Sequence, residues 1–350
     1  LRLTPAGEDC RYSTPIRVFA EVQAKNQIFI FDTGAPMNVF DREMSAYLTP
    51  PIGSVLAGTP HGDVKMTIHE APSISLTAQV IDLGSAAMTD LSSLNSAFGY
   101  SVAGILGAPL VIEFGIGFDQ EGDFFYLGRD KGREFAATFA MEITESNQLY
   151  SDHVYLHENS LRCLIDTGMN MPLSITSSYF DELESRGQLR ELYTYQAQTI
   201  NGSISERKGL LYSLEVWGQS FKDVPVGASN KNIIGLDLLK RFSFFLNGPD
   251  RIIEVGDGCN TTEPFLYDRS GLRIEFRNQK ISIAHIRPDS PAEKANLSVG
   301  TSILALNDQA LDSDWKELFR LREIFSMPGP VNLKLRIQDN AVQREAQLQW

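Results

Sequence analysis

Short apolar runs, each bounded by turn residues, recur along the chain and predict a mainly β protein. Two runs, residues 28–31 and 163–165, are apolar without interruption, which is typical of a buried strand. Elsewhere apolar and polar residues alternate, as in residues 16–22 and 331–337. Alternation of this kind indicates a strand with one face in the core and the other in solvent.

The two buried runs begin a pattern that occurs twice. Residues 32–34 and 166–168 both read Asp-Thr-Gly and directly follow a buried run. Much later in each copy, at a similar separation, comes an apolar pair and a glycine, at residues 105–107 and 233–235. A duplicated lobe explains the repeat, and it would bring one aspartate from each half to the centre.

Each copy also predicts a hairpin downstream of its triplet. Residues 54–58 and 64–68 form the first, and residues 195–200 turn at an Asn-Gly pair in the second. We expect segments 57–66 and 198–205 to fold over the site as flaps. The candidates for substrate contact at their tips are Thr59, His61, Asn201 and Gly202. The alternative for His61 is an ordinary exposed turn residue.

Helical patterns are few in the duplicated region. The spacing of apolar residues predicts short helices over residues 41–48, 179–185 and 236–242, and a loop before the strand at 103–107. Asp237 is expected at a helix start, where a carboxylate is favourable. We expect Tyr195, Trp217 and Trp315 to be packing residues.

The composition changes to Gly, Asn, Thr, Pro and Asp near residues 258–270, which indicates a linker. Beyond it a small α+β unit is predicted, with strands at residues 271–276, 281–286 and 302–307 and helices at 289–295 and 314–325. We therefore expect three units, at residues 1–135, 136–262 and 263–350.

Charge and length limit the partners. The 350-residue chain carries a formal net charge of −13, so nucleic acid is not an expected partner. No stretch approaches the ~20 apolar residues that span a bilayer, so no membrane is expected either. The chain begins at Leu1 rather than at methionine, as a processed chain does, and loss of a signal peptide or an anchor is one expectation.

Three cysteines do not make a disulfide scaffold. Cys163 lies in the second buried run and is expected to be a buried thiol. Cys10 and Cys259 flank the duplicated region, and they would pair if its terminal strands met, which requires an oxidising compartment. The alternative, two further free thiols, stays open.

Two aspartates at facing strand ends have a defined chemistry. Because two adjacent carboxylates cannot both be ionised cheaply, they hold one proton between them. The ionised partner can then take a proton from a water while the protonated partner donates to a substrate carbonyl. Binding of a divalent cation is a weaker alternative, since hard cations need more oxygens than two carboxylates supply. No motif indicates a metal or a cofactor.

At these residues the chain resembles the pepsin and retropepsin clan of aspartic proteases, over roughly residues 15–257. The resemblance implies two short retropepsin-like β lobes in one chain, forming a pseudo-two-fold acid protease domain. It implies Asp32 and Asp166 as the catalytic pair. It also implies four residues that support the pair: Thr33, Gly34, Thr167 and Gly168. Met169 and Pro36 depart from the residues usual after each glycine.

The C-terminal segment resembles a bacterial-type PDZ domain, through the Gly-Leu-Arg-Ile run at residues 271–274 and the Ser-Pro-Ala helix start at residues 290–292. Such a domain binds a peptide C-terminus by adding it as a strand. The residues expected to contact that peptide are Leu272, Arg273, Ile274 and Leu318.

The sequence therefore predicts an aspartic endopeptidase that acts on a protein or peptide substrate, with a PDZ domain for peptide or partner recognition. The alternative is a protease-like binding module with little or no turnover. We expect a monomer in the periplasm or secreted, with the cytoplasm as the alternative.

Overall fold

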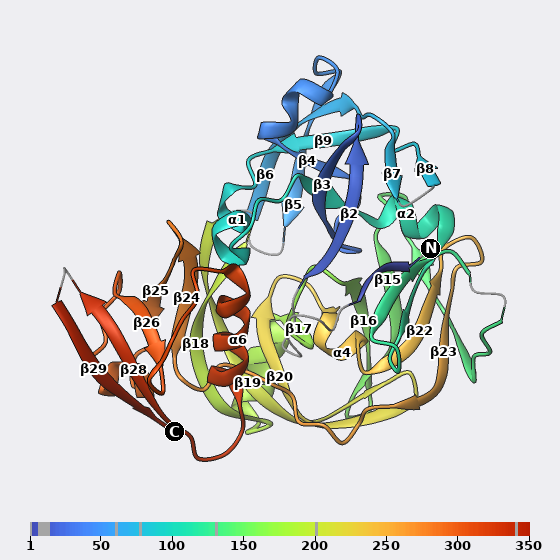
Figure 1. Cartoon of the computed structure of the whole chain (residues 1–350). Helices are drawn as coiled ribbons and strands as arrows, with labels where there is room; N and C mark the ends of the chain where they lie inside the picture. Colours follow the sequence, from blue (N-terminus) through green and yellow to red (C-terminus); the bar gives the residue numbers. More distant parts are fainter. Residues whose placement is uncertain are drawn as a thin grey trace.

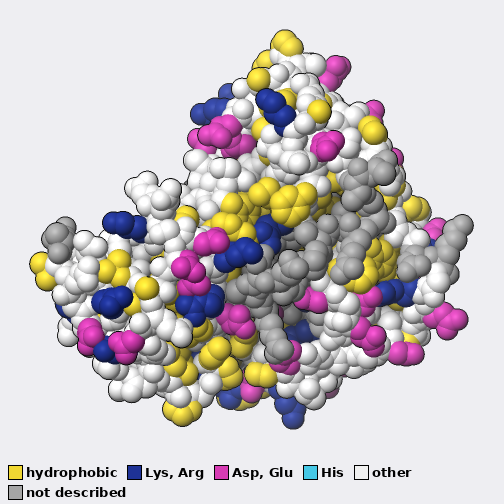
Figure 2. Space-filling model, in the orientation of Figure 1, with side chains coloured by type: hydrophobic (Ala, Val, Ile, Leu, Met, Phe, Trp, Pro, Cys, Tyr) yellow, Lys and Arg dark blue, Asp and Glu magenta, His cyan; other side chains and the backbone are white. Residues whose placement is uncertain are grey.

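The structure is a computed structural model that describes residues 2–5, 15–59, 62–76, 79–129, 132–199, 202–339 and 342–350. It is mainly β, as predicted, and its described strands form four sheets (Figure 1). On the face drawn in Figure 2, acidic and basic side chains are interspersed. No helix in these described ranges has the length and apolar character needed to cross a membrane.

Sheet 1 has nine strands in the order β5-β6-β9-β4-β10-β3-β2-β7-β8. The long strands at its centre are β2 and β3, which pair as a hairpin in full register from Ile16↔Phe31 to Val22↔Lys25. Its strands are β2 (Ile16–Val22), β3 (Lys25–Phe31), β4 (Val39–Asp41), β5 (Gly53–Thr59), β6 (Gly62–Glu70), β7 (Ile74–Leu76), β8 (Gln79–Ile81), β9 (Ser85–Thr89) and β10 (Gly104–Leu106). The 3-10 helix η1 (Arg42–Tyr47) and helix α1 (Ser92–Phe98) belong to the same region.

Sheet 2 has eight strands in the order β14-β15-β16-β21-β17-β20-β19-β18. Its strands are β14 (Glu142–Ile143), β15 (Leu149–Leu156), β16 (Asn159–Asp166), β17 (Leu173–Thr176), β18 (Leu189–Thr199), β19 (Gly202–Val216), β20 (Gln219–Ser229) and β21 (Ile233–Gly235). Helices α3 (Ser177–Ser185) and α4 (Leu236–Leu239) follow β17 and β21.

Seven strands have the same order in the two sheets, β5-β6-β9-β4-β10-β3-β2 and β18-β19-β20-β17-β21-β16-β15. The directions match as well. β3 and β16 each pair parallel with the short strand β10 or β21, which pairs antiparallel with β4 or β17. The repeat seen in the sequence is therefore a repeat of topology.

Sheet 3 joins the two halves in the order β1-β12-β11-β22-β23-β13. Its central contact is between β11 and β22, through pairs such as Phe118↔Phe244. The strands are β1 (Arg2–Pro5), β11 (Ile116–Asp119), β12 (Phe124–Leu127), β13 (Ala137–Ala140), β22 (Phe242–Asn247) and β23 (Ile252–Cys259), and helix α2 (Ala108–Phe114) precedes β11. One apolar core extends from Ile16 to Phe265 across both halves.

Sheet 4 and two helices form the C-terminal unit, which has an apolar core of its own. The strand order is β24-β25-β26-β28-β29, with β27 on β26. The elements are β24 (Leu272–Arg277), β25 (Lys280–Ile286), α5 (Pro291–Lys294), β26 (Ser302–Leu306), β27 (Gln309–Ala310), α6 (Trp315–Ser326), β28 (Asn332–Asp339) and β29 (Val342–Gln349). The predicted strands and both helices of this unit are present, and Asp314 and Ser290 cap the helices.

Two expectations need correction. The segment before the strand at 103–107 is not a plain loop, because it contains β9 and α1. Cys259 is a free thiol, so it is not in the disulfide considered above; Cys10 lies outside the described residues. Cys163 is a buried free thiol, as predicted.

Candidate active site

The two Asp-Thr-Gly turns lie at the ends of parallel strand pairs. In sheet 1, Ile30 and Phe31 pair with Ile105 and Leu106, and the Asp32 amide donates to the Leu106 carbonyl at 2.9 Å. In sheet 2, residues 164–166 pair with residues 233–235. The apolar pair of each copy thus lies in the neighbouring strand that fixes the aspartate.

Two threonines tie the turns to each other. The Thr33 amide donates to Oγ1 of Thr167 at 3.0 Å, and the Thr167 amide donates to Oγ1 of Thr33 at 3.0 Å. Each hydroxyl then donates to a carbonyl of the other half, Thr33 to Ile165 at 2.7 Å and Thr167 to Phe31 at 3.2 Å. Both threonines are fully buried. The four bonds hold the two turns in one symmetric arrangement.

The two glycines allow the carboxyls to come together. A Cβ built on Gly34 would lie 2.4 Å from Cγ of Asp166, and one on Gly168 would lie 2.3 Å from Cγ of Asp32. Real Cβ atoms do not come so close to another atom, so each turn requires glycine to pass under the other half's carboxyl. The Gly34 and Gly168 amides also donate to Oδ1 of Asp32 and Asp166, both at 2.8 Å.

Asp32 and Asp166 are half-buried and lie within hydrogen-bonding range of each other. Burial raises the pKa of both carboxyls above the ordinary aspartate range. For Asp166 the negative charge of Asp32 adds to burial, and its pKa lies well above the ordinary value. The pair can therefore hold one proton while one carboxylate stays ionised.

Two polar residues that the sequence did not single out support this region. Oδ1 of the buried Asn38 accepts from the Gly107 amide at 3.0 Å, which ties the segment after the first turn to the strand end beside it. The buried Asp41 accepts from the Leu91 amide at 2.7 Å, at the start of α1. Neither residue has a sequence neighbourhood that distinguishes it from an ordinary turn residue.

Both predicted hairpins are present. Strands β5 and β6 pair from Gly53↔Ile68 to Thr59↔Gly62, and β18 and β19 pair up to Thr199↔Gly202. Of the four expected contact residues, Thr59 and Gly202 belong to the last strand pairs of the hairpins, and His61 and Asn201 lie outside the described residues.

The two hairpins have different surroundings. Val55, Ala57 and Val64 of the first pack in one cluster with Ala35 and Met37, directly after the first turn. The second hairpin contacts the C-terminal unit: the Arg287 guanidinium lies 4.5 Å from the Tyr193 ring centre, and the Tyr267 hydroxyl donates to Glu191 at 2.6 Å. The first hairpin therefore lies beside the first aspartate turn, while the described part of the second braces the C-terminal unit.

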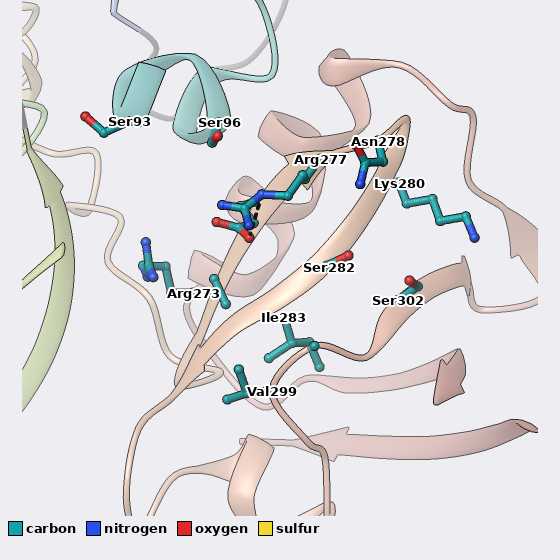
Figure 3. Close-up of a pocket in the computed structure, with 13 residues that line it drawn as sticks. Ser93, Ser96, Arg273, Arg277, Asn278, Lys280, Ser282, Ile283, Val299 and Ser302 are labelled. Atoms are coloured by element: carbon teal, nitrogen blue, oxygen red, sulfur yellow. Dashed lines mark ion pairs between the residues drawn. The ribbon is translucent and has the colours of Figure 1, made fainter. Parts of the chain in front are cut away.

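The residues expected to contact a peptide in the C-terminal unit are divided between two faces. Leu272, Ile274 and Leu318 are buried together in its core. Arg273 instead lines an open, polar hollow of about 790 Å³ beside α1 (Figure 3).

Trp217 and Asp237, also noted from the sequence, lie outside the aspartate pair. Trp217 is buried and donates to Ser151 at 3.1 Å. Asp237 lies in the first turn of α4, where burial raises its pKa to about 6. Within the described residues, no group of three or more His, Cys, Asp or Glu side chains could hold a metal ion.

Neither a model of a known protein family nor a curated protein sequence matches this chain. The functional argument therefore depends on the geometry of the two turns.

Proposed function

We propose that the chain is an aspartic endopeptidase of the pepsin and retropepsin type. The observation that carries the proposal is the pair Asp32 and Asp166, adjacent at the ends of two strands of equivalent topology and able to share one proton. The four-bond threonine network is symmetric about this pair. Residues 1–135 and 136–262 would be its two retropepsin-like lobes.

In the proposed reaction the ionised carboxylate removes a proton from a water that lies between the two aspartates. The water oxygen attacks the peptide carbonyl carbon, and the protonated carboxyl donates its proton to the carbonyl oxygen. The proton taken from water then passes to the leaving nitrogen as the C–N bond breaks, and one hydroxyl of the diol returns its proton to the carboxylate that had donated it, which leaves a carboxylic acid and restores the pair. No covalent intermediate and no metal is needed, because the pair supplies both the base and the acid.

Peptide hydrolysis by three variants tests this function. Asp32→Asn and Asp166→Asn should each lower kcat by about a thousandfold or more, because residues that act as a unit fail together. Asp237→Asn is the matched control, since it removes a half-buried carboxyl of raised pKa in the second half, outside the pair. A purified chain that binds peptides but cleaves none would instead support the binding-module function, and an active Asp166→Asn variant would refute the pair.

Residues 263–350 would be a PDZ domain that recognises a peptide or a partner. Support comes from an edge strand, β24, lying beside helix α6, the arrangement in which a peptide can add to a sheet. A periplasmic or secreted monomer that acts on protein or peptide substrates is the setting that we propose for the whole chain.

A further inference from the structure

Helix α1 has neighbours in three parts of the molecule: the first hairpin, strand β18 of the second hairpin and strand β24 of the C-terminal unit. Its apolar residues Leu94 and Phe98 pack in one cluster with Val64 and Met66 of the first hairpin. The helix ends at Gly99, whose φ of 79° is left-handed and favours glycine. On its other side α1 contacts β24 of the C-terminal unit.

The contact lies at the edge of sheet 4. Among the described strands, β24 pairs with β25 alone, so its other edge is the one to which a peptide strand would add. Nη2 of Arg322, on α6, donates to the Ile274 carbonyl of β24 at 3.0 Å and to the Ala97 carbonyl of α1 at 2.9 Å. Figure 3 shows α1, with Ser93 and Ser96, above the same strand, whose Arg273 and Arg277 line the same hollow.

The end of α1 fits closely between β24 and α6. A Cβ built on Gly99 would lie 2.6 Å from Cβ of Trp315 and 3.0 Å from Cβ of Phe276. The next residue, Tyr100, has its ring 5.1 Å from the Trp315 ring, edge to face. The end of α1 therefore leaves no room for a peptide between β24 and α6, whereas Ser93 and Ser96 of the same helix border the open hollow beside β24.

The loop that precedes β24 already binds a carboxylate. Asp268 accepts from the Ser270 amide at 3.1 Å, the Ser270 hydroxyl at 2.6 Å and the Gly271 amide at 2.9 Å. The Leu272 amide donates to Oγ of Ser270 at 3.0 Å. Asp268 thus occupies amide groups of the loop that would otherwise receive the terminal carboxylate of a peptide.

We propose that α1 and Asp268 together are an internal ligand of the C-terminal unit. α1 takes the place of an added peptide strand, and Asp268 takes the place of its terminal carboxylate. A peptide with an apolar last residue and a free carboxylate then binds only by displacing α1. This inference depends on the peptide-recognition part of the proposed function and is independent of hydrolysis.

Displacement of α1 would reach the candidate active site through short connections. α1 follows β9, which pairs with β6 of the first hairpin, and it precedes β10, which pairs with β3 beside Asp32. A peptide that binds the C-terminal unit more tightly when α1 is displaced would therefore also change the position of the first hairpin. The size of the shift is set by the difference in the peptide's affinity for the two states.

The test measures peptide binding to the full chain in an Asp166→Asn background, where cleavage does not interfere. The probes are short labelled peptides that end in Val, Leu or Phe, each with a free carboxylate and as an amide. Gly99→Ala should expel the end of α1, and Gly84→Ala is its matched control, because Gly84 also has positive φ but no atom within 4 Å of an added Cβ.

We expect Gly99→Ala to bind the free-carboxylate peptides at least about tenfold more tightly than Gly84→Ala does, since it removes the competing state. If Gly99→Ala does not fold, Arg322→Met replaces it, because it removes the bonds to the Ala97 and Ile274 carbonyls. Arg322→Met should then bind the same peptides at least about tenfold more tightly than its control on the same helix, Arg320→Met. Hydrogen exchange should become faster in α1 and slower in β24 when peptide is added.

Equal affinities in variant and control, or no binding to any variant, would overturn the proposal and make the α1 contact a permanent interface. Unchanged exchange in α1 at saturating peptide would also overturn it. Absence of cleavage by the unmodified chain would count against the endopeptidase function alone, because every binding measurement uses the Asp166→Asn background.

Discussion

Thr33 and Thr167 each use one hydroxyl twice, as an acceptor from the amide of the other threonine and as a donor to the carbonyl that precedes the other half's aspartate. Because both side chains are fully buried, water cannot replace a bond that is lost. These two residues therefore determine both the stability of the junction and the positions of the carboxyls.

Thr33→Ala should lower the free energy of unfolding by about 3 kcal/mol, because it leaves the Thr167 amide and the Ile165 carbonyl buried without their partner. Thr33→Ser keeps the hydroxyl and should cost less than about 1 kcal/mol. The urea midpoint at constant m value measures both. Equal losses in the two variants would mean that the methyl group, and not the hydroxyl, stabilises the junction.

The shared proton predicts the pH dependence of hydrolysis. At low pH both carboxyls are protonated and no base remains; at high pH both are ionised and no acid remains. Because burial and the charge of Asp32 raise the pKa of Asp166, activity should persist above the ordinary aspartate pKa and fall at higher pH. The profile of kcat/KM against pH should be bell-shaped, whereas a single acidic limb with a flat plateau to high pH would exclude a shared proton.

The elements predicted correctly are those that a local sequence pattern specifies. The buried runs before Asp32 and Asp166, both hairpins and helix α6 are where alternation or helical period placed them. Helix α1 was missed although Leu91, Leu94 and Phe98 have helical spacing before Gly99, because the run is short and rich in serine. Its contacts with β24 join residues far apart in the chain, and no local signal reports these.

The first hairpin predicts how a substrate is recognised. Since β5 and β6 pack beside the first turn, a substrate bound beneath them would lie extended and present side chains on both sides of the cut. Cleavage of a peptide library should therefore depend on apolar residues at several positions on either side of the scissile bond, and shortening the peptide should lower kcat/KM. Dependence on a single position would argue against this binding mode.

Sheet 3 makes the two halves one folding unit. β11 of the first half pairs directly with β22 of the second, and one core contains residues of both. The sequence predicted two lobes but not this sheet, because the pair that joins them, β11 and β22, lies more than a hundred residues apart and no turn fixes its register. The C-terminal unit, by contrast, has a separate core.

Phe265 lies past the expected boundary at residue 262, yet it packs on the duplicated region. Its buried ring packs 6.0 Å from the Phe221 ring and 3.6 Å from the Arg241 guanidinium, whose N–H groups donate to the carbonyls of Asn260, Glu263 and Pro264. Phe265 thus belongs to the core of the duplicated region although it lies within the segment of linker composition.

Two truncations should therefore differ. A chain ending at residue 266 keeps Phe265, and it should fold and hydrolyse peptides with altered substrate choice. A chain ending at residue 263 loses that ring and should be less stable by about 3 kcal/mol or more, as when a core phenylalanine is removed. Chemical unfolding of the two chains measures the difference. Equal stability would place the boundary before Phe265, and loss of hydrolysis by the longer chain would show that the C-terminal unit is required for activity.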